Sequence, residues 1–515
     1  MVTSRQAGTT HSQQLLTLDV GPMAHGGHCV ARHEGRVIFV RHAIPGEVVR
    51  ARVTDSGPQA KFWRADVVEV LEASDYRRRH IWKLADALRA HEMDRLPVGG
   101  AEYGHITDQH QRRVKAQVFR DTLQRIGGIH LQDLTLAHAP ADGEIHVVDV
   151  GERHSNGLHW RTRVSFGVND HGVLSMKPYR SHELIDLRGM PLAVEDIHES
   201  RLFGGDFTGA QRVDVVAPGG RAPLALVVHA EQSRAEEAGL RQRLLRIADV
   251  EPKVETIVLA LARADDARAE APNGGGAVAR NGARSGVRNG RRGSARGRTR
   301  GRPEVPRVPA VVEHEIVLGG RTVAEPLPVP VATGDGEERA VVPLRPEGFW
   351  QIHRHAPEAL VRTIDEMASV GAGDAVADLY AGAGLFTAWA AARTGETGQV
   401  LSVEAAAGSS ASARELFDRT QHVRVETAPV ERVLDALGGH DLILVDPPRA
   451  GAGKKVIGGV DAADARRLVY VSCEPASFAR DAKDLLARGW RLADLQVLDL
   501  YPNTHHMESV ALFER

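Results

Sequence analysis

Cysteine is almost absent from this chain, which has only Cys29 and Cys473 in 515 residues. Two thiols cannot form a framework of disulfides or hold an iron–sulfur cluster, and such sparing use is typical of proteins in a reducing compartment. The chain also has no apolar run long enough to span a bilayer, and its first residues, MVTSRQAGTTHSQQ, lack the apolar core of a secretion signal. We therefore expect a cytoplasmic protein with no membrane partner and no iron–sulfur cluster.

An excess of charge of one sign is absent as well. The chain has 65 lysines and arginines against 67 aspartates and glutamates, so its formal net charge is -2. This balance gives no global indication of a nucleic-acid partner. With 515 residues, 42% of them hydrophobic, the chain is expected to form two or three globular domains.

A small β-barrel is predicted for residues 12 to 73, where short alternating runs such as GRVIFVRH and GEVVRARVTD are broken by turn residues. Basic and aromatic side chains are interleaved there: Arg36, Arg41, Arg50, Arg52, Lys61, Phe62, Trp63 and Arg64. Such a mixture suits RNA, because cations contact phosphates and rings stack on bases. The same composition also occurs on the solvated face of any small barrel, and both readings stay open.

Residues 74 to 345 predict an α+β domain, interpreted as an RNA-recognition domain. It contains the helix-like HQRRVKAQVFRDTLQRI and strand-like runs around NDHG, residues 169 to 172, which predict a hairpin turn. Residues 266 to 307 are predicted to be a disordered insertion, because PNGGGAVARNGARSGVRNGRRGSARGRTRGRP cannot bury enough apolar surface. This Arg/Gly-rich insertion is either a tether that attracts RNA phosphates or a plain linker.

Residues 346 to 515 alternate short apolar runs with helix-like stretches. The runs AVADLY, QVLSVE, DLILVD and RLVYVSC predict buried parallel strands, and the pattern predicts a doubly wound, Rossmann-like α/β domain. Ligands of such sheets bind at the carboxyl ends of the strands. The residues that follow each run are therefore the candidates for a functional site.

The first run enters a helix through a turn that contains Gly382 and Gly384. Glycines there let the backbone approach a ligand, and the start of the helix offers unpaired N–H groups. Asp378 precedes this turn, and Glu404 ends the next strand, where a carboxylate commonly accepts hydrogen bonds from ribose hydroxyls. Because the third glycine of a dinucleotide site is missing, the pattern favours S-adenosylmethionine; a tight turn beside a surface acid is the alternative.

Two further strand ends carry groups suited to pyrimidine chemistry. Asp446 opens the stretch DPPR and could accept a hydrogen bond from the ring N–H of a base. Cys473 could add to carbon 6 of a pyrimidine, which turns carbon 5 into a nucleophile for a methyl group. A base must then remove the carbon-5 proton, and Glu508 in HHMESV is the candidate. Taken alone, however, a strand cysteine is usually a small core residue.

In order and spacing, DLYAGAGLFT, DPPRAG, YVSCEPASFARD and HHMESV resemble the RNA (uracil-5-)-methyltransferase family. GFWQIHRHAPEAL resembles a further segment of that family, and residues 12 to 73 resemble its TRAM domain. The resemblance implies that Cys473 is the nucleophile and Glu508 the base. The candidates for cofactor binding are Gln351, Asp378, Tyr380, Gly382, Gly384, Glu404 and Asp446.

The chain departs from the family pattern at several positions. Ala428 and Pro429 stand where an aspartate near the adenine is usual, and His353 and Glu474 stand where asparagine is usual. The stretch RAHEMDRLPVGGAEYGHI has no cysteine where some members carry four for an iron–sulfur cluster. No cluster is therefore expected.

The sequence thus predicts an S-adenosylmethionine-dependent enzyme that forms 5-methyluridine in structured rRNA or tRNA, with RNA as its partner and a monomer as its state. One alternative is an RNA-binding or folding protein of the same fold with weak or lost catalysis. Another is formation of 5-methylcytosine, which RNA enzymes perform with two cysteines at neighbouring strand ends. The stretch DPPRAG contains no cysteine, which disfavours that alternative.

Overall fold

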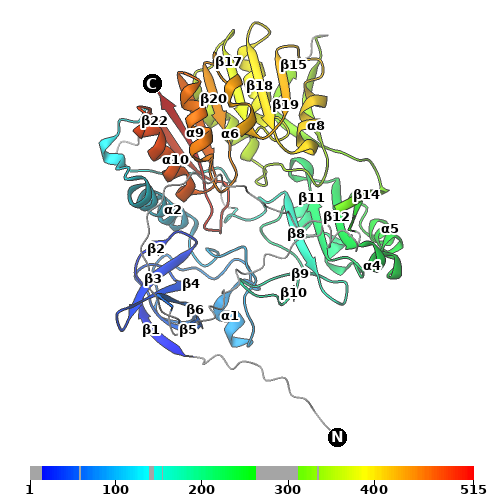
Figure 1. Ribbon diagram of the computed structural model, residues 1–515. Helices are drawn as coiled ribbons and strands as arrows, with labels where there is room; N and C mark the ends of the chain where they lie inside the picture. The colour runs from blue at the N-terminus through cyan, green and yellow to red at the C-terminus, as the bar shows by residue number, and fades with distance from the viewer. Residues whose placement is uncertain (1–13, 57–59, 139–143, 153–154, 263–310, 333–335) are drawn as a thin grey trace, which may run out of the picture.

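The computed structural model describes residues 14–56, 60–138, 144–152, 155–262, 311–332 and 336–515. Figure 1 shows three lobes that meet at a common centre: a blue N-terminal barrel, a green central sheet and a yellow-to-red C-terminal sheet. The predicted α/β fold class is confirmed. The Arg/Gly-rich insertion, residues 266 to 307, lies outside the described residues. Within the described ranges, no helix has both the length and the apolar character needed to cross a bilayer.

The N-terminal lobe is a six-stranded sheet in the order β1-β5-β6-β4-β3-β2, called the barrel below. Its strands are β1 (Leu15–Asp19), β2 (Met23–Ala24), β3 (His28–His33), β4 (Arg36–Arg41), β5 (Val48–Asp55) and β6 (Phe62–Glu72). Alternate residues point inward, as Leu16 and Leu18 do in β1. Cys29 belongs to this core: it is 0% exposed, its Sγ lies 3.7 Å from Met23 Sδ, and burial raises its pKa. Cys29 therefore has a structural role.

The central lobe contains a seven-stranded sheet in the order β10-β9-β8-β11-β12-β13-β14. Its strands are β8 (Arg163–Val168), β9 (Leu174–Met176), β10 (Ile185–Asp186), β11 (Arg212–Val216), β12 (Leu224–Glu231), β13 (Val254–Ala262) and β14 (Val311–Leu318), and its helices are α3 (Glu195–His198), α4 (Gln232–Glu237) and α5 (Leu240–Val250). Helices α4 and α5 connect the parallel pair β12 and β13. Leu240, Leu244 and Ile247 recur at helical spacing and are the buried residues of α5. The predicted turn at residues 169 to 172 joins β8 to β9.

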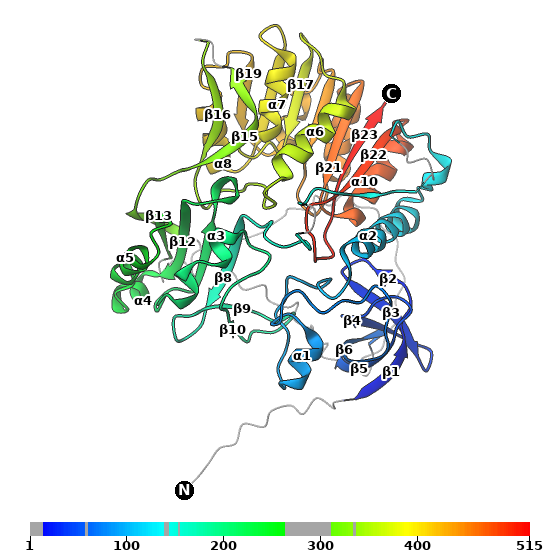
Figure 2. The ribbon, with the colours of Figure 1, turned by 180° about the vertical axis from the view of Figure 1, so that it is seen from behind.

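The C-terminal lobe contains an eight-stranded sheet in the order β19-β18-β17-β20-β21-β23-β22-β7. Its strands are β17 (Ala375–Leu379), β18 (Gln399–Glu404), β19 (Val423–Thr427), β20 (Leu442–Val445), β21 (Arg467–Ser472), β22 (Arg491–Asp499), β23 (Glu508–Glu514) and β7 (Val147–Asp149). The helices are α6 (Ala356–Ala368), α7 (Leu385–Thr394), α8 (Ala407–Leu416), α9 (Gly453–Ala462) and α10 (Pro475–Ala487). Helices α9 and α10 pack on one face of the sheet and α6, α7 and α8 on the other (Figure 1 and Figure 2), so apolar strand residues alternate between two cores. A two-stranded sheet, β15 (Val323–Ala332) with β16 (Glu338–Leu344), packs on α7 and α8.

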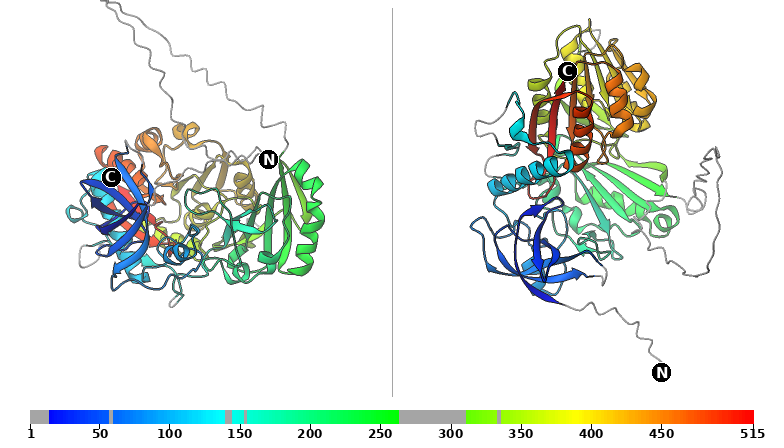
Figure 3. Two further views of the ribbon diagram at one scale, coloured as in Figure 1. Left: turned by 90° about the horizontal axis from the view of Figure 1, so that it is seen from below. Right: turned by 60° about the vertical axis from the view of Figure 1, so that its left-hand side comes forward.

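Part of the chain between the barrel and the central sheet belongs spatially to the C-terminal sheet. After α1 (Ala87–Glu92), α2 (Asp108–Thr122) lies between the barrel and the C-terminal sheet (Figure 3), and Phe119 stacks on Phe478 of α10 at 6.0 Å. Strand β7 then pairs with β22, with Val147 opposite Val497. The sequence predicted a helix around residue 115, but it did not predict that this helix packs against α10 of the C-terminal lobe.

Lys115 connects α2 to the C-terminal sheet through a buried ion pair. Its side chain is fully buried, and its Nζ donates to Asp499 Oδ1 at 2.6 Å and to the carbonyl of Tyr501 at 3.0 Å. Burial lowers the pKa of Lys115, and the Asp499 carboxylate opposes this effect. The pair therefore holds the start of the loop between β22 and β23 against α2.

We expect Lys115→Met to lower the free energy of unfolding by about 3–5 kcal/mol, because it leaves the buried Asp499 carboxylate without its partner. Urea denaturation measures this loss. Lys454→Met, on the exposed side of α9, is the matched control and should change stability by less than about 0.5 kcal/mol. A double variant, Lys115→Met with Asp499→Leu, should recover part of the loss; equal losses in Lys115→Met and the control would contradict the role of the pair.

Candidate active site

Five neighbouring strands of the C-terminal sheet bring functional side chains to one edge. Strands β18, β17, β20 and β21 run parallel, and β23 runs antiparallel to β21, so that the start of β23 lies at their carboxyl ends. In strand order, the residues at this edge are Glu404, Tyr380, Asp446, Cys473 and Glu508. At roughly 4.8 Å per strand, Glu404 and Cys473 are separated by about 14 Å along the edge. The edge therefore has a predicted cofactor end at Glu404 and a thiol end at Cys473.

The strand register places Cys473 across from Glu508. Ser472 of β21 pairs with Ser509 of β23, and the Ser509 hydroxyl donates to the Ser472 carbonyl at 3.2 Å. The next residue on β21 and the preceding one on β23 are therefore neighbours. Cys473 is partly exposed, whereas Glu508 is only 4% exposed. The predicted nucleophile and base thus lie side by side at the end of the sheet.

Burial and the repulsion between neighbouring acidic groups raise the pKa values of Cys473, Glu508 and Asp446. Burial, together with the nearby Glu508 and Asp446, raises the pKa of Cys473 to about 12, and Arg449 opposes the shift. Burial and the charge of Asp446 raise the pKa of Glu508 well above its usual value. Burial and Asp378 raise the pKa of Asp446 to about 7. At neutral pH Cys473 is therefore a thiol, and Asp446 can donate or accept a proton; clustered shifts of this kind are common in catalytic centres.

The predicted cofactor end consists of the glycine turn and Glu404. Gly382 N donates to Glu404 Oε2 at 2.9 Å, and Ala406 N donates to Glu404 Oε1 at 2.5 Å, which fixes the carboxylate while leaving lone pairs for a further donor. Gly382 and Gly384 have φ values of 58° and 98°, and the space in which Gly382 would carry a Cβ is empty of atoms within 4 Å. Tyr380, with φ 65°, adds a partly exposed ring to the same turn. These residues fit the ribose and the amino-acid part of S-adenosylmethionine.

Asp378 lies beneath this turn. It is 1% exposed, its Oδ2 accepts from the Thr387 hydroxyl at 2.6 Å, and its Oδ1 has no hydrogen-bond partner among the described residues. Burial raises the pKa of Asp378 to about 7. In this arrangement the carboxyl group ties the turn to α7, and its second oxygen is left for another donor.

Gln351 lies on the segment between β16 and α6, and the central lobe holds this segment. Thr162 donates to the carbonyl of Ile352 from its backbone N at 2.8 Å and from its hydroxyl at 3.2 Å. The neighbouring His353 is buried and stacks on Trp160 at 5.6 Å between ring centroids. Gln351 itself is partly exposed. The segment therefore reaches the C-terminal lobe already positioned by the central sheet.

Glu474, which follows the predicted nucleophile Cys473, connects this segment to the barrel. Its carboxylate caps α10 by accepting from Ala476 N at 3.4 Å, and it pairs with His25 Nε2 at 3.0 Å. The hydrogen bond to Glu474 raises the pKa of His25. The barrel also approaches the loop before Glu508, because a Cβ on Gly27 would lie 2.9 Å from His505 Cβ. The hairpin between β2 and β3 therefore touches the segments that carry both predicted catalytic residues.

A family model described as tRNA (Uracil-5-)-methyltransferase matches residues 366–515, which include the whole edge from Asp378 to Glu508. A relative in Streptomyces avermitilis, an uncharacterized RNA methyltransferase, is 32% identical over 502 residues, which cover 96% of this chain and 97% of the relative. The chain belongs to the RNA (uracil-5-)-methyltransferase family.

Further relatives of this RNA methyltransferase have more specific names. The 23S rRNA (uracil(1939)-C(5))-methyltransferase RlmD of Thiobacillus denitrificans is 28% identical, with 97% of this chain and 99% of the relative covered. The solved structure of the Pyrococcus abyssi tRNA (uracil-54, C5)-methyltransferase, in complex with S-adenosyl-L-homocysteine, aligns with a TM-score of 0.59 at 17% identity and covers 96% of this chain and 100% of that one. The similarity to the Pyrococcus abyssi structure establishes a shared fold. The predicted family and enzyme class are confirmed.

No group of three or more His, Cys, Asp or Glu side chains within the described residues of this RNA methyltransferase could hold a metal ion. The five strand-end residues and the residues beside them have further neighbours from other segments of the chain. Sequence reasoning missed two of these neighbours, His25 and Tyr501. His25 reaches Glu474 from the distant barrel, whereas Tyr501 reaches Glu508 from the loop only seven residues before it.

Proposed function

We propose that this RNA methyltransferase uses S-adenosylmethionine to methylate carbon 5 of a uridine in structured RNA. The observation that carries the proposal is the pairing of Ser472 with Ser509, which sets the thiol of Cys473 beside the carboxyl group of Glu508 at the sheet edge that also holds Glu404. Methylation at nitrogen or oxygen needs no thiol, because those atoms already carry a lone pair. A thiol beside a base suits a carbon acceptor.

The residues of this chain divide the reaction into addition and release. The Cys473 sulfur bonds to carbon 6 of the uracil, its proton passes to a nearby base, and the electron pair of the 5,6 double bond becomes available at carbon 5. Bound S-adenosylmethionine supplies the methyl group to carbon 5. Glu508 then takes the carbon-5 proton, the double bond re-forms, and the bond between carbon 6 and sulfur breaks. The thiolate finally regains its proton, so the cysteine is unchanged.

The cofactor would be held by Glu404 through its ribose hydroxyls and by the turn at Gly382 and Gly384 through close backbone approach. Tyr380 and Gln351 would form the sides of this site. Asp446 lies between the cofactor end and Cys473, where its carboxyl group can contact the uracil ring. With a pKa raised to about 7, it can be either donor or acceptor near neutral pH.

The choice of uridine over cytidine is supported by the number of thiols at this edge. The other cysteine of the chain, Cys29, is buried in the barrel core. Formation of 5-methylcytosine by two cysteines at neighbouring strand ends would therefore lack its second thiol at this edge. The proposal of 5-methyluridine needs only that one.

The barrel offers a surface for the RNA outside the target base. The Arg36 guanidinium lies 4.4 Å from the centre of the Trp63 ring, and that of Arg64 lies 4.8 Å from the centre of Phe62. Phe39 contacts Phe62 edge to face at 5.1 Å. Rings and cations combined in this way can stack on unpaired bases and contact phosphates, and the target uridine would have to leave its stack to reach Cys473.

Nucleoside mass spectrometry on RNA treated with the purified protein and methyl-labelled S-adenosylmethionine tests the function. Transcripts of 23S rRNA segments and of tRNAs, offered separately, should yield labelled 5-methyluridine from one class. Label in 5-methylcytidine, or binding of RNA without any labelled nucleoside, would contradict the proposal. The second outcome would favour an RNA-binding protein without catalysis.

Glu404→Ala should weaken S-adenosylmethionine binding by roughly 10- to 100-fold, because it removes the acceptor fixed by Gly382 N and Ala406 N. Isothermal titration calorimetry measures the affinity directly. Glu426→Ala, on the neighbouring strand β19, is the matched control and should bind like the unchanged protein. Equal affinities for both variants would remove Glu404 from the cofactor site.

A further inference from the structure

Tyr501 lies in the loop between β22 and β23, seven residues before Glu508. Its hydroxyl donates to Glu508 Oε2 at 3.2 Å, and this is the hydrogen bond that the described structure provides for the Glu508 carboxyl group. Because Glu508 is only 4% exposed, water has little access to replace that donor. The contact therefore bears directly on the group that must remove a proton.

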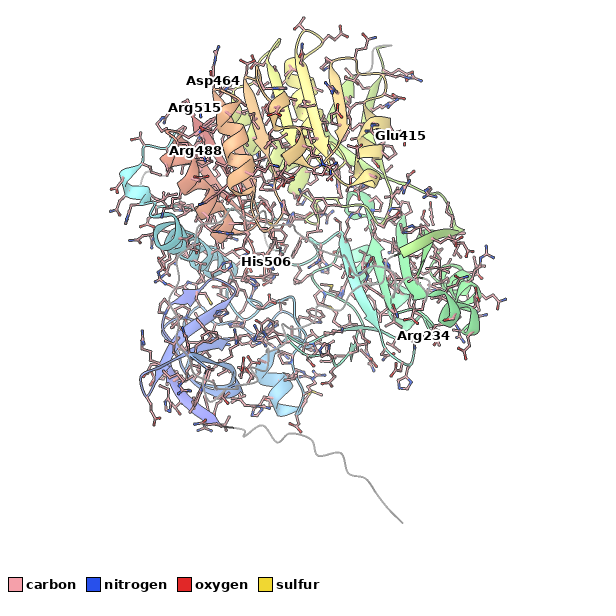
Figure 4. The ribbon with its side chains drawn as sticks, in the orientation of Figure 1. Arg234, Glu415, Asp464, Arg488, His506 and Arg515 are labelled. Atoms are coloured by element: carbon pink, nitrogen blue, oxygen red, sulfur yellow. The ribbon has the colours of Figure 1, made fainter. Side chains whose placement is uncertain are left out.

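The Tyr501 ring is held from several sides. It meets Trp160 edge to face at 6.2 Å and His506 at 5.9 Å. The backbone carbonyl of Tyr501 accepts hydrogen bonds from Lys115 Nζ at 3.0 Å and from the Thr504 hydroxyl at 2.8 Å. Figure 4 labels His506 on this loop, near the centre where the lobes meet. The hydroxyl thus has a fixed direction toward Glu508, set by α2, the central lobe and the loop itself.

We infer that Tyr501 is a positioning residue for the release step: its hydroxyl holds the Glu508 carboxylate in the orientation and ionised state that take the carbon-5 proton. This inference rests on the proposed function. The bond that forms in the step is between a Glu508 oxygen and the carbon-5 proton, and the bonds that break are carbon 5 to hydrogen and carbon 6 to sulfur. Tyr501 keeps its own proton throughout.

The electrostatics of the loop agree with that assignment. Burial and Asp446 raise the pKa of Glu508, and the Tyr501 hydrogen bond acts in the opposite direction by stabilising the charged carboxylate. Burial and Glu508 raise the pKa of Tyr501 well above its usual value, so the phenol remains a donor. The titratable and charged groups that face this pair are Asp446, Arg449, Cys473, His506, Arg161 and Lys115.

Tyr501→Phe tests the inference because it removes one oxygen atom and retains the ring. We expect the methylated covalent complex between protein and uridine RNA to decay about tenfold more slowly, as expected for the loss of a hydrogen bond to a charged group. The rising limb of the release rate should also move to higher pH, since Glu508 loses a partner that favours its ionised form. Trapping on RNA that contains 5-fluorouridine should occur at the unchanged rate, because it requires addition but no proton removal.

Site-specific replacement of Tyr501 by 3-fluorotyrosine supplies the opposite perturbation. Its more acidic hydroxyl donates more strongly, so the rising limb should move to lower pH; a purely structural role for the ring would not produce shifts of opposite sign. Tyr470→Phe is the matched control. The hydroxyl of Tyr470 donates to the Asp481 carboxylate, with 2.7 Å between the two oxygen atoms, and so does not contact Glu508. This variant should leave the release profile in place.

The outcomes separate this inference from the proposed function. If the unchanged protein forms no adduct with 5-fluorouridine RNA, the proposed function fails. If the unchanged protein traps the RNA and turns over uridine, but Tyr501→Phe releases its complex at the same rate and with the same pH profile, the inference alone fails. A loss of trapping equal to the loss of release in a folded Tyr501→Phe protein would also overturn it.

Discussion

Cys473→Ala is expected to abolish methyl transfer, with a loss of more than roughly 10⁴-fold, because no other group at the sheet edge can add to carbon 6 of a pyrimidine. The experiment is to incubate the protein with S-adenosylmethionine and RNA that contains 5-fluorouridine. Fluorine cannot leave as a proton does, so the methylated adduct should persist and migrate as a protein–RNA band in a denaturing gel. The band should be absent for Cys473→Ala.

Cys29→Ala is the control that the chain itself provides, since it removes the other thiol from the barrel core. That variant should lose some stability through the small cavity it leaves, but it should still form the trapped band. A band that persists in Cys473→Ala and disappears in Cys29→Ala would show that Cys29, and not Cys473, is the nucleophile. A band that persists in both variants would show that no cysteine makes the covalent bond.

The strand ends of the C-terminal sheet could be predicted from the sequence because each buried run is short and ends in an informative residue. DLILVD and RLVYVSC place Asp446 and Cys473 immediately after β20 and β21. The carboxyl ends of parallel strands meet at one edge, so residues separated by long helices could be brought together before any coordinates were known. The same reasoning identified Glu404, which ends β18.

The contacts between lobes could not be predicted in this way. His25 reaches Glu474, and Lys115 reaches Asp499, across hundreds of residues, and neither pair shows any periodicity that would connect them. The packing of α2 and the pairing of β7 with β22 likewise depend on how the lobes dock. Tyr501 is closer in sequence to Glu508, but its direction is set by Trp160 and Lys115 from other parts of the chain. Local pattern identifies the reacting groups, whereas tertiary packing determines what surrounds them.

The residues around Glu474 show how a contact between lobes supports the predicted active site. Glu474 has two partners in the structure: the start of α10 and His25 of the barrel. The barrel therefore directly contacts the segment that carries Cys473, the proposed nucleophile. The ion pair between His25 and Glu474 therefore connects the barrel to the residue next to Cys473.

Glu508→Gln should stall the reaction after methyl transfer, because the carboxamide has nearly the same shape but cannot take the carbon-5 proton. The release rate should fall by roughly 10²–10⁴-fold, the range typical of a general base. With ordinary uridine RNA and methyl-labelled S-adenosylmethionine, the measurable result is a labelled protein–RNA complex in a denaturing gel. Unmodified protein should show little of this complex, because it completes release.

The same substitution should not slow addition. The charge of Glu508 contributes to the raised pKa of Cys473, so its removal lowers that pKa and makes the thiolate easier to form. Glu514→Gln, at the other end of β23 and paired with Arg491, is the matched control and should release its product at the normal rate. Normal turnover in Glu508→Gln would exclude this residue as the base. A loss of both addition and release would instead mean that Glu508 acts before the methyl group is transferred, as the acceptor of the Cys473 proton.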